Sequence, residues 1–288
     1  QAALVAAVCW TVTSLCFEFS SKRIGSLSVN VIKMYLAFVF FTVSALIFEE
    51  LHLPSDAGGF EWIWLGLSGL IGFVIGDLFL FKALSIVGAR ISMLVMSLVP
   101  LVTTLMGFVL LKETLSPLHC FGMALTIGGV AAVILVRETD TKQLKHPVKG
   151  LVCAAIGMGG QAVGLVLSKY GMGEYNAFSA TQIRIIAGLA GFTLLTFHLK
   201  SWTRLWDSLK RPPALTVTSI GTFFGPFIGV YMSLLAVQRT ETGIASTIMA
   251  IVPVMIIPFS IVLYKEKVTL REMIGAVIAV AGTAIMFS

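Results

Sequence analysis

The chain consists of apolar runs of about 20 residues, separated by short polar breaks. A helix of about 20 residues, rising 1.5 Å per residue, crosses the ~30 Å hydrocarbon core of a bilayer. Lipid offers no hydrogen-bond partner to an open backbone, so each run is expected to be helical. Charged residues make up only 12% of the 288 residues, about half the ~25% that is typical of soluble domains. These features predict an all-α integral membrane protein.

We predict ten transmembrane helices joined by short connections, none of them long enough to form a soluble domain. The predicted spans are residues 3–21, 30–48, 61–81, 90–111, 118–136, 148–170, 178–198, 214–237, 243–264 and 271–287. Two of the connections, 49–60 and 199–213, contain prolines that favour turns.

Lysine and arginine are distributed unevenly between the predicted loops. Fifteen of the 20 lie in odd-numbered loops and three in even-numbered loops, while Lys33 and Arg184 lie inside spans. The positive-inside rule therefore places the odd-numbered loops in the cytoplasm and both termini outside. Because the net charge of +6 is spread over five loops, it does not form a patch for nucleic acid.

The second half of the sequence repeats the first half at a shift of 153 residues. Matched positions are Lys112-Glu113 with Lys265-Glu266, Val99-Pro100 with Val252-Pro253, and Gly122 and Gly129 with Gly275 and Gly282. We therefore predict two five-helix repeats, residues 1–138 and 148–288, joined by a basic linker at 139–147. An odd number of helices inverts the second repeat relative to the first, a construction that is typical of secondary transporters.

Glycines and prolines also occupy matching places in the two predicted repeats. Glycines spaced four apart let helix backbones approach closely. Prolines inside spans 4 and 9 are predicted to kink these helices, and kinks at corresponding places point to the binding region. Static packing is the alternative for any single glycine. The predicted hinge or packing residues are Gly72, Gly76, Pro100, Gly225, Gly229 and Pro253.

The ordered set of motifs resembles the EamA repeat of the drug/metabolite transporter superfamily. The motifs are Ala83–Ala89, Leu98–Leu101, Leu110–Leu115 and Gly122 in the first half, and Ala236–Thr240, Ile251–Val254, Lys265-Glu266 and Gly275 in the second. The resemblance implies ten helices in two inverted halves, with a central cavity lined mainly by spans 1, 3, 4, 6, 8 and 9. Family members carry amino acids, other small metabolites, sugars or drugs, often outward. The resemblance also implies cytoplasmic termini, opposite to the charge count, so both orientations stay open.

The sequence departs from related proteins in the first span. Many relatives have Trp-Gly where this chain has Trp10-Thr11. The related small multidrug resistance proteins carry a proton-exchanging carboxylate near this depth, where this chain has Trp10 and, in the second repeat, Gly157. That coupling mechanism is therefore not carried over to this chain.

Few ionisable groups lie at membrane depth, where burying one costs about 2.5–3.5 kcal/mol. Asp77 is either a helix-end carboxylate paired with a nearby cation, or a site for a proton or a substrate amine. Glu18 is either an ordinary helix partner of Lys22, four residues on, or a second candidate for proton coupling. Lys33 and Arg184 match in the two repeats. Lys33 is predicted to snorkel to the interface, whereas Arg184 is either structural or the partner of a carboxylate or phosphate.

Uncharged polar and aromatic side chains are the other candidates for a substrate cavity. A buried amide such as that of Gln161 needs partners, which a neighbouring helix or a ligand supplies. The aromatic residues either form an apolar wall for the solute or pack the core. With Asp77 and Arg184, the predicted cavity residues are Trp10, Thr11, Ser14, Phe81, Ser92, Met96, Gln161, Phe224, Tyr231 and Met249. The scarcity of charge favours a neutral, zwitterionic or hydrophobic solute.

These features predict a secondary transporter that exports small organic metabolites, such as amino acids, by alternating access. Its expected location is the plasma membrane, which in a bacterium is the inner membrane. Asp77 or Glu18 is the candidate site for coupling to protons, and a homodimer is a candidate assembly. A channel or lipid-handling protein is the alternative. Neither an enzyme nor an ATP-driven pump is expected, since clustered catalytic residues and a Walker motif are missing. No cofactor or metal site is expected, because the histidines and cysteines lack ligand spacing.

Overall fold

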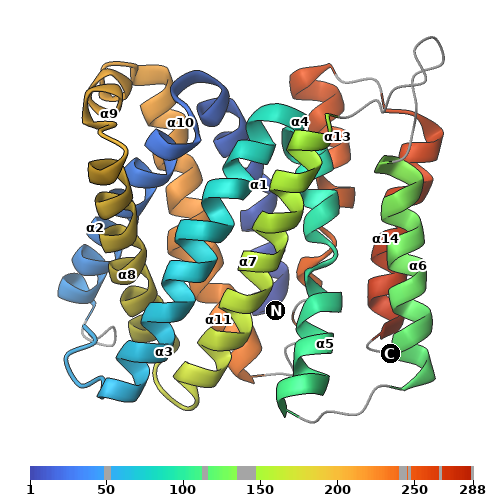
Figure 1. The fold of residues 1–288 in the computed structure, drawn as a ribbon, viewed down its shortest axis with the longest axis horizontal. Helices are drawn as coiled ribbons and strands as arrows, with labels where there is room; N and C mark the ends of the chain where they lie inside the picture. The colour runs from blue at the N-terminus through green and yellow to red at the C-terminus, as the bar shows by residue number, and fades with distance from the viewer. Residues whose placement is uncertain are drawn as a thin grey trace.

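The computed structural model describes residues 1–48, 53–111, 116–134, 147–239, 245, 248–265 and 268–286. All regular secondary structure in these ranges is helical, which confirms the all-α prediction. Figure 1 shows the helices running roughly side by side, with both termini toward the same end. The repeat markers Lys112, Glu113 and Glu266, and most of the predicted linker 139–147, lie outside the described residues.

The helices of the first half follow the predicted spans closely. They are α1 (Ala2–Ile24), α2 (Ser26–Ile47), α3 (Gly59–Gly69), the π-helix η1 (Leu70–Asp77), α4 (Leu78–Met96), α5 (Val99–Leu111) and α6 (Pro117–Ile134). Two glycines with positive φ separate segments: Gly25 (φ 84°) lies between α1 and α2, and Gly88 (φ 80°) interrupts α4. Glycine adopts this backbone conformation at no steric cost.

The second half contains a similar series of helices. They are α7 (Val148–Met172), α8 (Ala177–His198), α9 (Trp202–Leu209), α10 (Pro212–Thr222), the π-helix η2 (Phe223–Gly229), α11 (Val230–Arg239), α13 (Val252–Tyr264) and α14 (Leu270–Met286). Helix α9 lies in the predicted connection 199–213. Its Leu205 is buried while Trp206 is 62% exposed, so this short helix is amphipathic. With only 8 residues, it is too short to cross a membrane.

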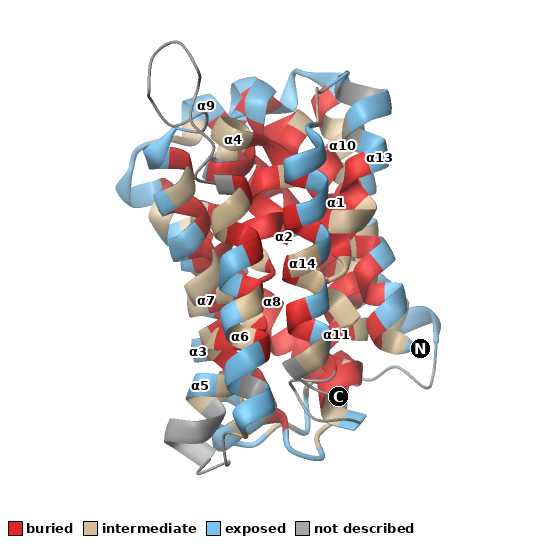
Figure 2. Cartoon of the chain, turned by 90° about the vertical axis from the view of Figure 1, so that its right-hand side faces the viewer, coloured by how far each residue is buried: buried red, intermediate tan, exposed pale blue. Residues whose placement is uncertain are grey.

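Six helical stretches of the described chain are long and apolar enough to cross a membrane, judged by length and composition. They are Ala2–Ile24, Ser26–Ile47, Gly59–Met96, Val148–Met172, Ala177–His198 and Pro212–Arg239. The outside of the molecule is apolar: Leu46, Phe197 and Val262 are 74%, 73% and 74% exposed. Polar side chains such as that of Asn30 are buried, by contrast, and buried residues fill the inside of the helical bundle in Figure 2. An apolar exterior around a partly polar interior suits a lipid environment.

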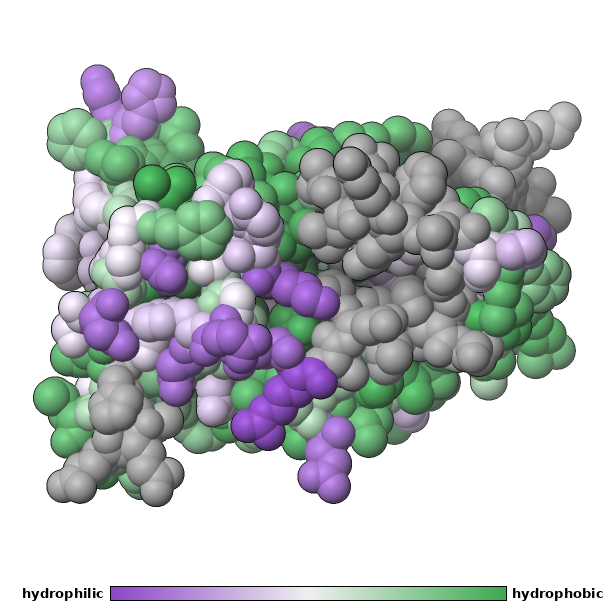
Figure 3. Space-filling view, turned by 90° about the horizontal axis from the view of Figure 1, so that it is seen from below, coloured by the Kyte–Doolittle hydropathy of each residue, from purple (hydrophilic) through white to green (hydrophobic). Residues whose placement is uncertain are grey.

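One end of the molecule presents a polar face. Seen from the end that carries the termini, hydrophilic residues gather on the face, with hydrophobic residues toward its upper and lower edges (Figure 3). A polar end surrounded by apolar sides suits a membrane-spanning protein.

The predicted kinks at Pro100 and Pro253 are instead complete breaks. Turns precede α5 and α13, so each proline is the second residue of a new helix. A proline is tolerated in the first turn of a helix, but in the interior it clashes with the carbonyl four residues back. The two breaks share a hydrogen-bond pattern: Leu101 N–H donates to the Leu98 carbonyl at 3.1 Å, and Val254 N–H donates to the Ile251 carbonyl at 3.0 Å.

The π-helices η1 and η2 also start 153 residues apart, and each packs on a helix of the other half of the chain. Helix α7 lies along α3 and η1, while α1 lies along α10 and η2. Ser68 of α3 donates to the Gly164 carbonyl at 2.6 Å, and Thr13 of α1 donates to the Gly221 carbonyl at 3.1 Å. Helices α6 and α14 form a separate pair at one side (Figure 1), where the Thr126 and Thr283 hydroxyl oxygens lie 3.3 Å apart.

The glycine stripes allow backbone contact between η1 and α7. Replacing Gly160 by Ala is expected to lower the free energy of unfolding by about 2 kcal/mol, because the new Cβ would lie 2.7 Å from the Gly76 Cα. The neighbouring Gly159 is a matched control, since a Cβ there meets nothing within 4 Å. Denaturant unfolding of both variants in detergent measures the difference. Equal stability of the two variants would contradict the close approach of η1 and α7.

Candidate functional site

A cavity of about 140 Å³ lies between the helices and is lined by residues of both halves. It is close in size to an engineered cavity of about 150 Å³ that takes up benzene. Both helix breaks border the cavity, one through Ser97 and Pro100 and the other through Ala250 and Pro253. The structure thus brings the two matched breaks to one space.

Many of the residues that the sequence singled out line this cavity. They are Trp10, Ser14, Asp77, Phe81, Met96, Gln161, Arg184 and Met249, together with Pro100 and Pro253. Four other predicted cavity residues, Thr11, Ser92, Phe224 and Tyr231, are not part of the lining. The Thr11 hydroxyl donates to the Ala7 carbonyl at 2.9 Å, Ser92 is fully buried, Phe224 packs edge-on against Phe223, and Tyr231 packs edge-on against Phe178.

The predicted packing glycines lie where helices meet. Gly72 and Gly76 face α7, while Gly225 and Gly229 face α1. A Cβ on Gly225 would lie 2.7 Å from the Thr13 hydroxyl oxygen, and one on Gly229 would lie 3.3 Å from the Cys9 Cβ. Gly225 therefore leaves no room for a Cβ unless Thr13 shifts, and a Cβ on Gly229 would require its neighbours to give by a few tenths of an ångström.

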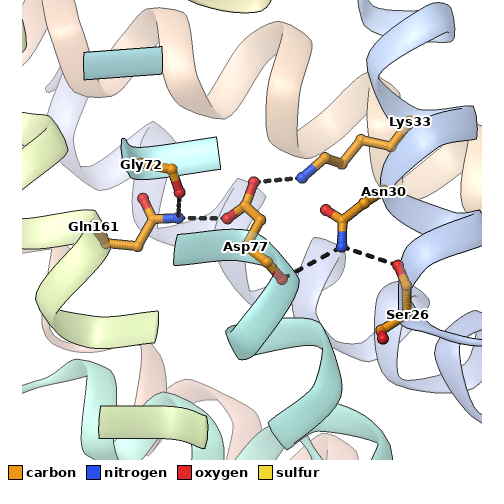
Figure 4. Close-up of polar contacts among 6 residues, drawn as sticks. All are labelled: Ser26, Asn30, Lys33, Gly72, Asp77 and Gln161. Atoms are coloured by element: carbon orange, nitrogen blue, oxygen red, sulfur yellow. Dashed lines mark hydrogen bonds and ion pairs between the residues drawn. The ribbon is translucent and has the colours of Figure 1, made fainter. Parts of the chain in front are cut away.

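Asp77 lies at the end of η1 and is held by side chains from two other helices (Figure 4). The Lys33 ammonium of α2 pairs with one carboxylate oxygen, and the Gln161 amide of α7 donates to the other. Gln161 also donates to the Gly72 carbonyl at 3.1 Å, and Asn30 donates to the Asp77 main-chain carbonyl at 3.4 Å. Both carboxylate oxygens of Asp77 are therefore occupied by protein groups.

The position of Lys33 corrects the prediction that its side chain reaches the membrane interface. The side chain is only 1% exposed and lines the cavity. Its ammonium group lies 4.3 Å from the centre of the Phe81 ring, in addition to its ion pair with Asp77. An opposite charge and an aromatic face offset the cost of removing a cation from water. Sequence spacing does not show that Asp77, 44 residues further on, faces Lys33.

Arg184 of α8 is the second cation of the cavity and is 4% exposed. Its guanidinium lies 4.8 Å from the centre of the Phe73 ring and within electrostatic range of Asp77. Its buried Nε has no hydrogen-bond partner. Lys33 and Arg184 are the residues that α2 and α8 contribute to the lining, so the matched pair of the sequence meets in one site.

Glu18 lies outside the cavity lining and has a different environment from Asp77. One carboxylate oxygen pairs with Lys22, and the other accepts the Ala89 N–H at 2.7 Å, directly after the break at Gly88. Glu18 thus supplies an acceptor to a helix start that the broken backbone leaves without one.

A helical protein with an apolar exterior and a cavity that holds charged groups between broken helices has the architecture of a membrane transporter. The family model of the EamA-like transporter family matches residues 1–135 and 148–288. The chain therefore belongs to the EamA-like transporter family, within the drug/metabolite transporter superfamily, and is a multi-pass membrane transporter. Members of this family are transporters rather than enzymes.

Solved structures share the fold. One of them, described only as a crystal structure of a protein, aligns with a TM-score of 0.65 over 99% of this chain and 95% of its own. Its sequence identity is 19%, so the likeness shows the fold alone. Curated protein sequences give no significant match. Within the described residues, no group of three or more His, Cys, Asp and Glu is placed to hold a metal ion.

Proposed function

We propose that the protein is a secondary carrier that exports small organic metabolites, such as amino acids, from the cytoplasm by alternating access. The observation that carries the proposal is that two helix breaks with the same hydrogen-bond pattern border one cavity. Each half of the chain supplies one break and one π-helix. If the two halves exchange conformations, the cavity opens first to one side of the membrane and then to the other.

We infer that the chain forms ten spans in two inverted repeats, residues 1–138 and 148–288. The π-helices at a shift of 153 residues and the crosswise packing of α7 on η1 and of α1 on η2 support this division. The separate family matches to residues 1–135 and 148–288 support it too.

We place the carrier in the plasma membrane of the cell. The uneven distribution of Lys and Arg supports cytoplasmic placement of the end that carries α9, with both termini outside. In a variant without Cys120, a cysteine replacing the exposed Lys200 is expected to react with an impermeant maleimide only from the cytoplasm. A cysteine replacing the exposed Ser55 is expected to react only from outside. The reverse pattern would overturn this orientation.

We propose Asp77, rather than Glu18, as the site at which the carrier couples to protons. Asp77 lines the cavity, whereas Glu18 holds the Ala89 amide outside it. A group that exchanges protons during transport has to meet the solute path, which favours Asp77.

Saturable transport tests the carrier proposal. Purified protein in proteoliposomes is expected to take up radiolabelled leucine at a rate that reaches a plateau, because each solute molecule requires one conformational cycle. Leucine is a suitable first probe because its small apolar body fits a cavity of about 140 Å³. A rate that rises linearly at all concentrations, for leucine and for other small metabolites, would favour the channel alternative and contradict a carrier.

A further inference from the structure

The cavity carries one more positive charge than negative charge. Among the described residues of its lining, the charged side chains are Lys33, Asp77 and Arg184. All three are buried, with exposed fractions of 1%, 6% and 4%. An uncompensated charge in a low-dielectric interior is costly, so a site of this kind favours a ligand of opposite charge.

The carboxylate of Asp77 already has two partners within the protein. Lys33 occupies one of its oxygens and Gln161 the other. A substrate ammonium entering the cavity would have to share this carboxylate with Lys33, and it would add a third positive charge to the two cations already present. The site therefore disfavours recognition of an amine.

The guanidinium of Arg184 has a hydrogen-bond donor that no protein group uses. Its Nε is a buried donor without a partner, and leaving such a donor unsatisfied costs free energy. A carboxylate accepts two parallel hydrogen bonds from a guanidinium, which suits Arg better than any other cation. The ring of Phe73, 4.8 Å from the guanidinium carbon, holds the guanidinium in position.

The hydroxyl groups of the lining are already used within the protein. Thr13, Ser14, Ser97 and Ser233 each donate to a main-chain carbonyl, at 3.1, 2.9, 2.6 and 2.7 Å. The Trp10 indole donates to the Ser233 hydroxyl at 3.2 Å. The rest of the lining is largely apolar, including Phe17, Leu84 and Leu234. A solute with many hydroxyl groups, such as a sugar, would find few free hydroxyl donors here.

We propose that the transported solute is a small monocarboxylate with an apolar body, and that its carboxylate binds Arg184. This inference rests on the proposed function and names the part of the solute that the carrier recognises. The carboxylate neutralises the single excess charge and accepts a hydrogen bond from the Arg184 Nε. The hydrocarbon part of the solute lies against the apolar lining. An α-ammonium group is not required, so an amino acid binds through its carboxylate alone.

Three ligands that share a 3-methylbutyl body test this inference on the unmodified protein. Calorimetry in detergent at pH 7 compares 4-methylpentanoate, leucine and 3-methylbutylamine. We expect 4-methylpentanoate to bind at least as tightly as leucine and the amine to bind at least tenfold more weakly than either, the loss that follows removal of a charged hydrogen-bond partner. Binding of the amine as tight as that of the acid, or leucine binding tenfold tighter than the acid, would overturn the proposal.

Substitution of Arg184 provides the second test. Arg184→Gln removes the excess charge and leaves the Lys33–Asp77 pair intact, so we expect this variant to fold and to bind 4-methylpentanoate at least tenfold more weakly. Arg184→Lys keeps the charge and is expected to recover part of the affinity. Unchanged affinity in Arg184→Gln would overturn the proposal. Because binding is measured without transport, carboxylate binding in a protein that shows no saturable uptake would reject the carrier and not the ligand class.

Discussion

Replacing Asp77 by Asn is expected to lower the free energy of unfolding by about 3–5 kcal/mol, the range for breaking a buried ion pair. The variant would leave Lys33 and Arg184 buried together, at 1% and 4% exposure, with no carboxylate in the described lining of the cavity. Each cation has lost contact with water, so neither has solvent to replace the missing charge. Unfolding by denaturant in detergent measures the loss.

A double variant separates the ion pair from other effects of the substitution. Adding Lys33→Met to Asp77→Asn restores the single excess charge of the unmodified cavity, so most of the lost stability is expected to return. Asp207→Asn is the matched control, because this carboxylate pairs with Lys210 at 3.2 Å but is 72% exposed. It should leave stability unchanged. A double variant as unstable as Asp77→Asn alone would show that charge balance is not what Asp77 supplies.

The same double variant tests whether Asp77 couples transport to protons. If the carboxylate exchanges a proton during the cycle, uptake by the double variant should no longer respond to an imposed pH gradient, although saturable uptake continues. A response equal to that of the unmodified protein would reject Asp77 as the coupling group.

Gly69→Ala is expected to be similarly damaging, with a loss of about 3 kcal/mol at the upper end of the range for overpacking. A Cβ at this position would lie 2.9 Å from the Cα and 3.0 Å from the carbonyl carbon of Arg184. These are main-chain atoms, so α8 itself has to move away from α3, and Arg184 moves with it. We therefore expect the variant to lose both stability and affinity for 4-methylpentanoate.

Gly66→Ala is the control for this second prediction. Gly66 lies in the same helix, and a Cβ there would be 4.0 Å from the Ala187 side chain of α8, an ordinary contact. It should preserve stability and affinity, since alanine also favours the helix more than glycine does. A Gly69→Ala variant that behaves like Gly66→Ala would contradict the close contact between α3 and α8.

The sequence predicts the elements of this fold better than it predicts the site. Apolar runs locate the long helices because length and hydrophobicity are local properties. The matched prolines Pro100 and Pro253 predict where the breaks that border the cavity lie, although each is the second residue of a new helix where a kink was expected. The pairing of Lys33 with Asp77 is not visible in the sequence, because it depends on how the fold places α2 relative to η1. A search for long apolar runs also misses helix α9, because this helix is short and amphipathic.

The prediction of a neutral, zwitterionic or hydrophobic solute rests on the number of charges along the chain. A count cannot show that both oxygens of Asp77 are occupied, nor that the Nε of Arg184 has no partner. The two cations match in sequence, yet their effect depends on Asp77, a carboxylate that the first half of the chain supplies. Spatial placement, rather than composition, therefore points to a carboxylate.

Counterflow tests the central claim, that this protein is an alternating-access carrier, most directly. Proteoliposomes loaded with unlabelled solute and diluted into a trace of radiolabelled solute are expected to accumulate label above its equilibrium level for a time. The accumulation occurs because a carrier returns loaded and exchanges one molecule for another. Leucine and 4-methylpentanoate are the solutes to use, with Gly159→Ala as a control variant that should behave like the unmodified protein. Label that rises only to equilibrium, with solute present on both sides, would contradict alternating access.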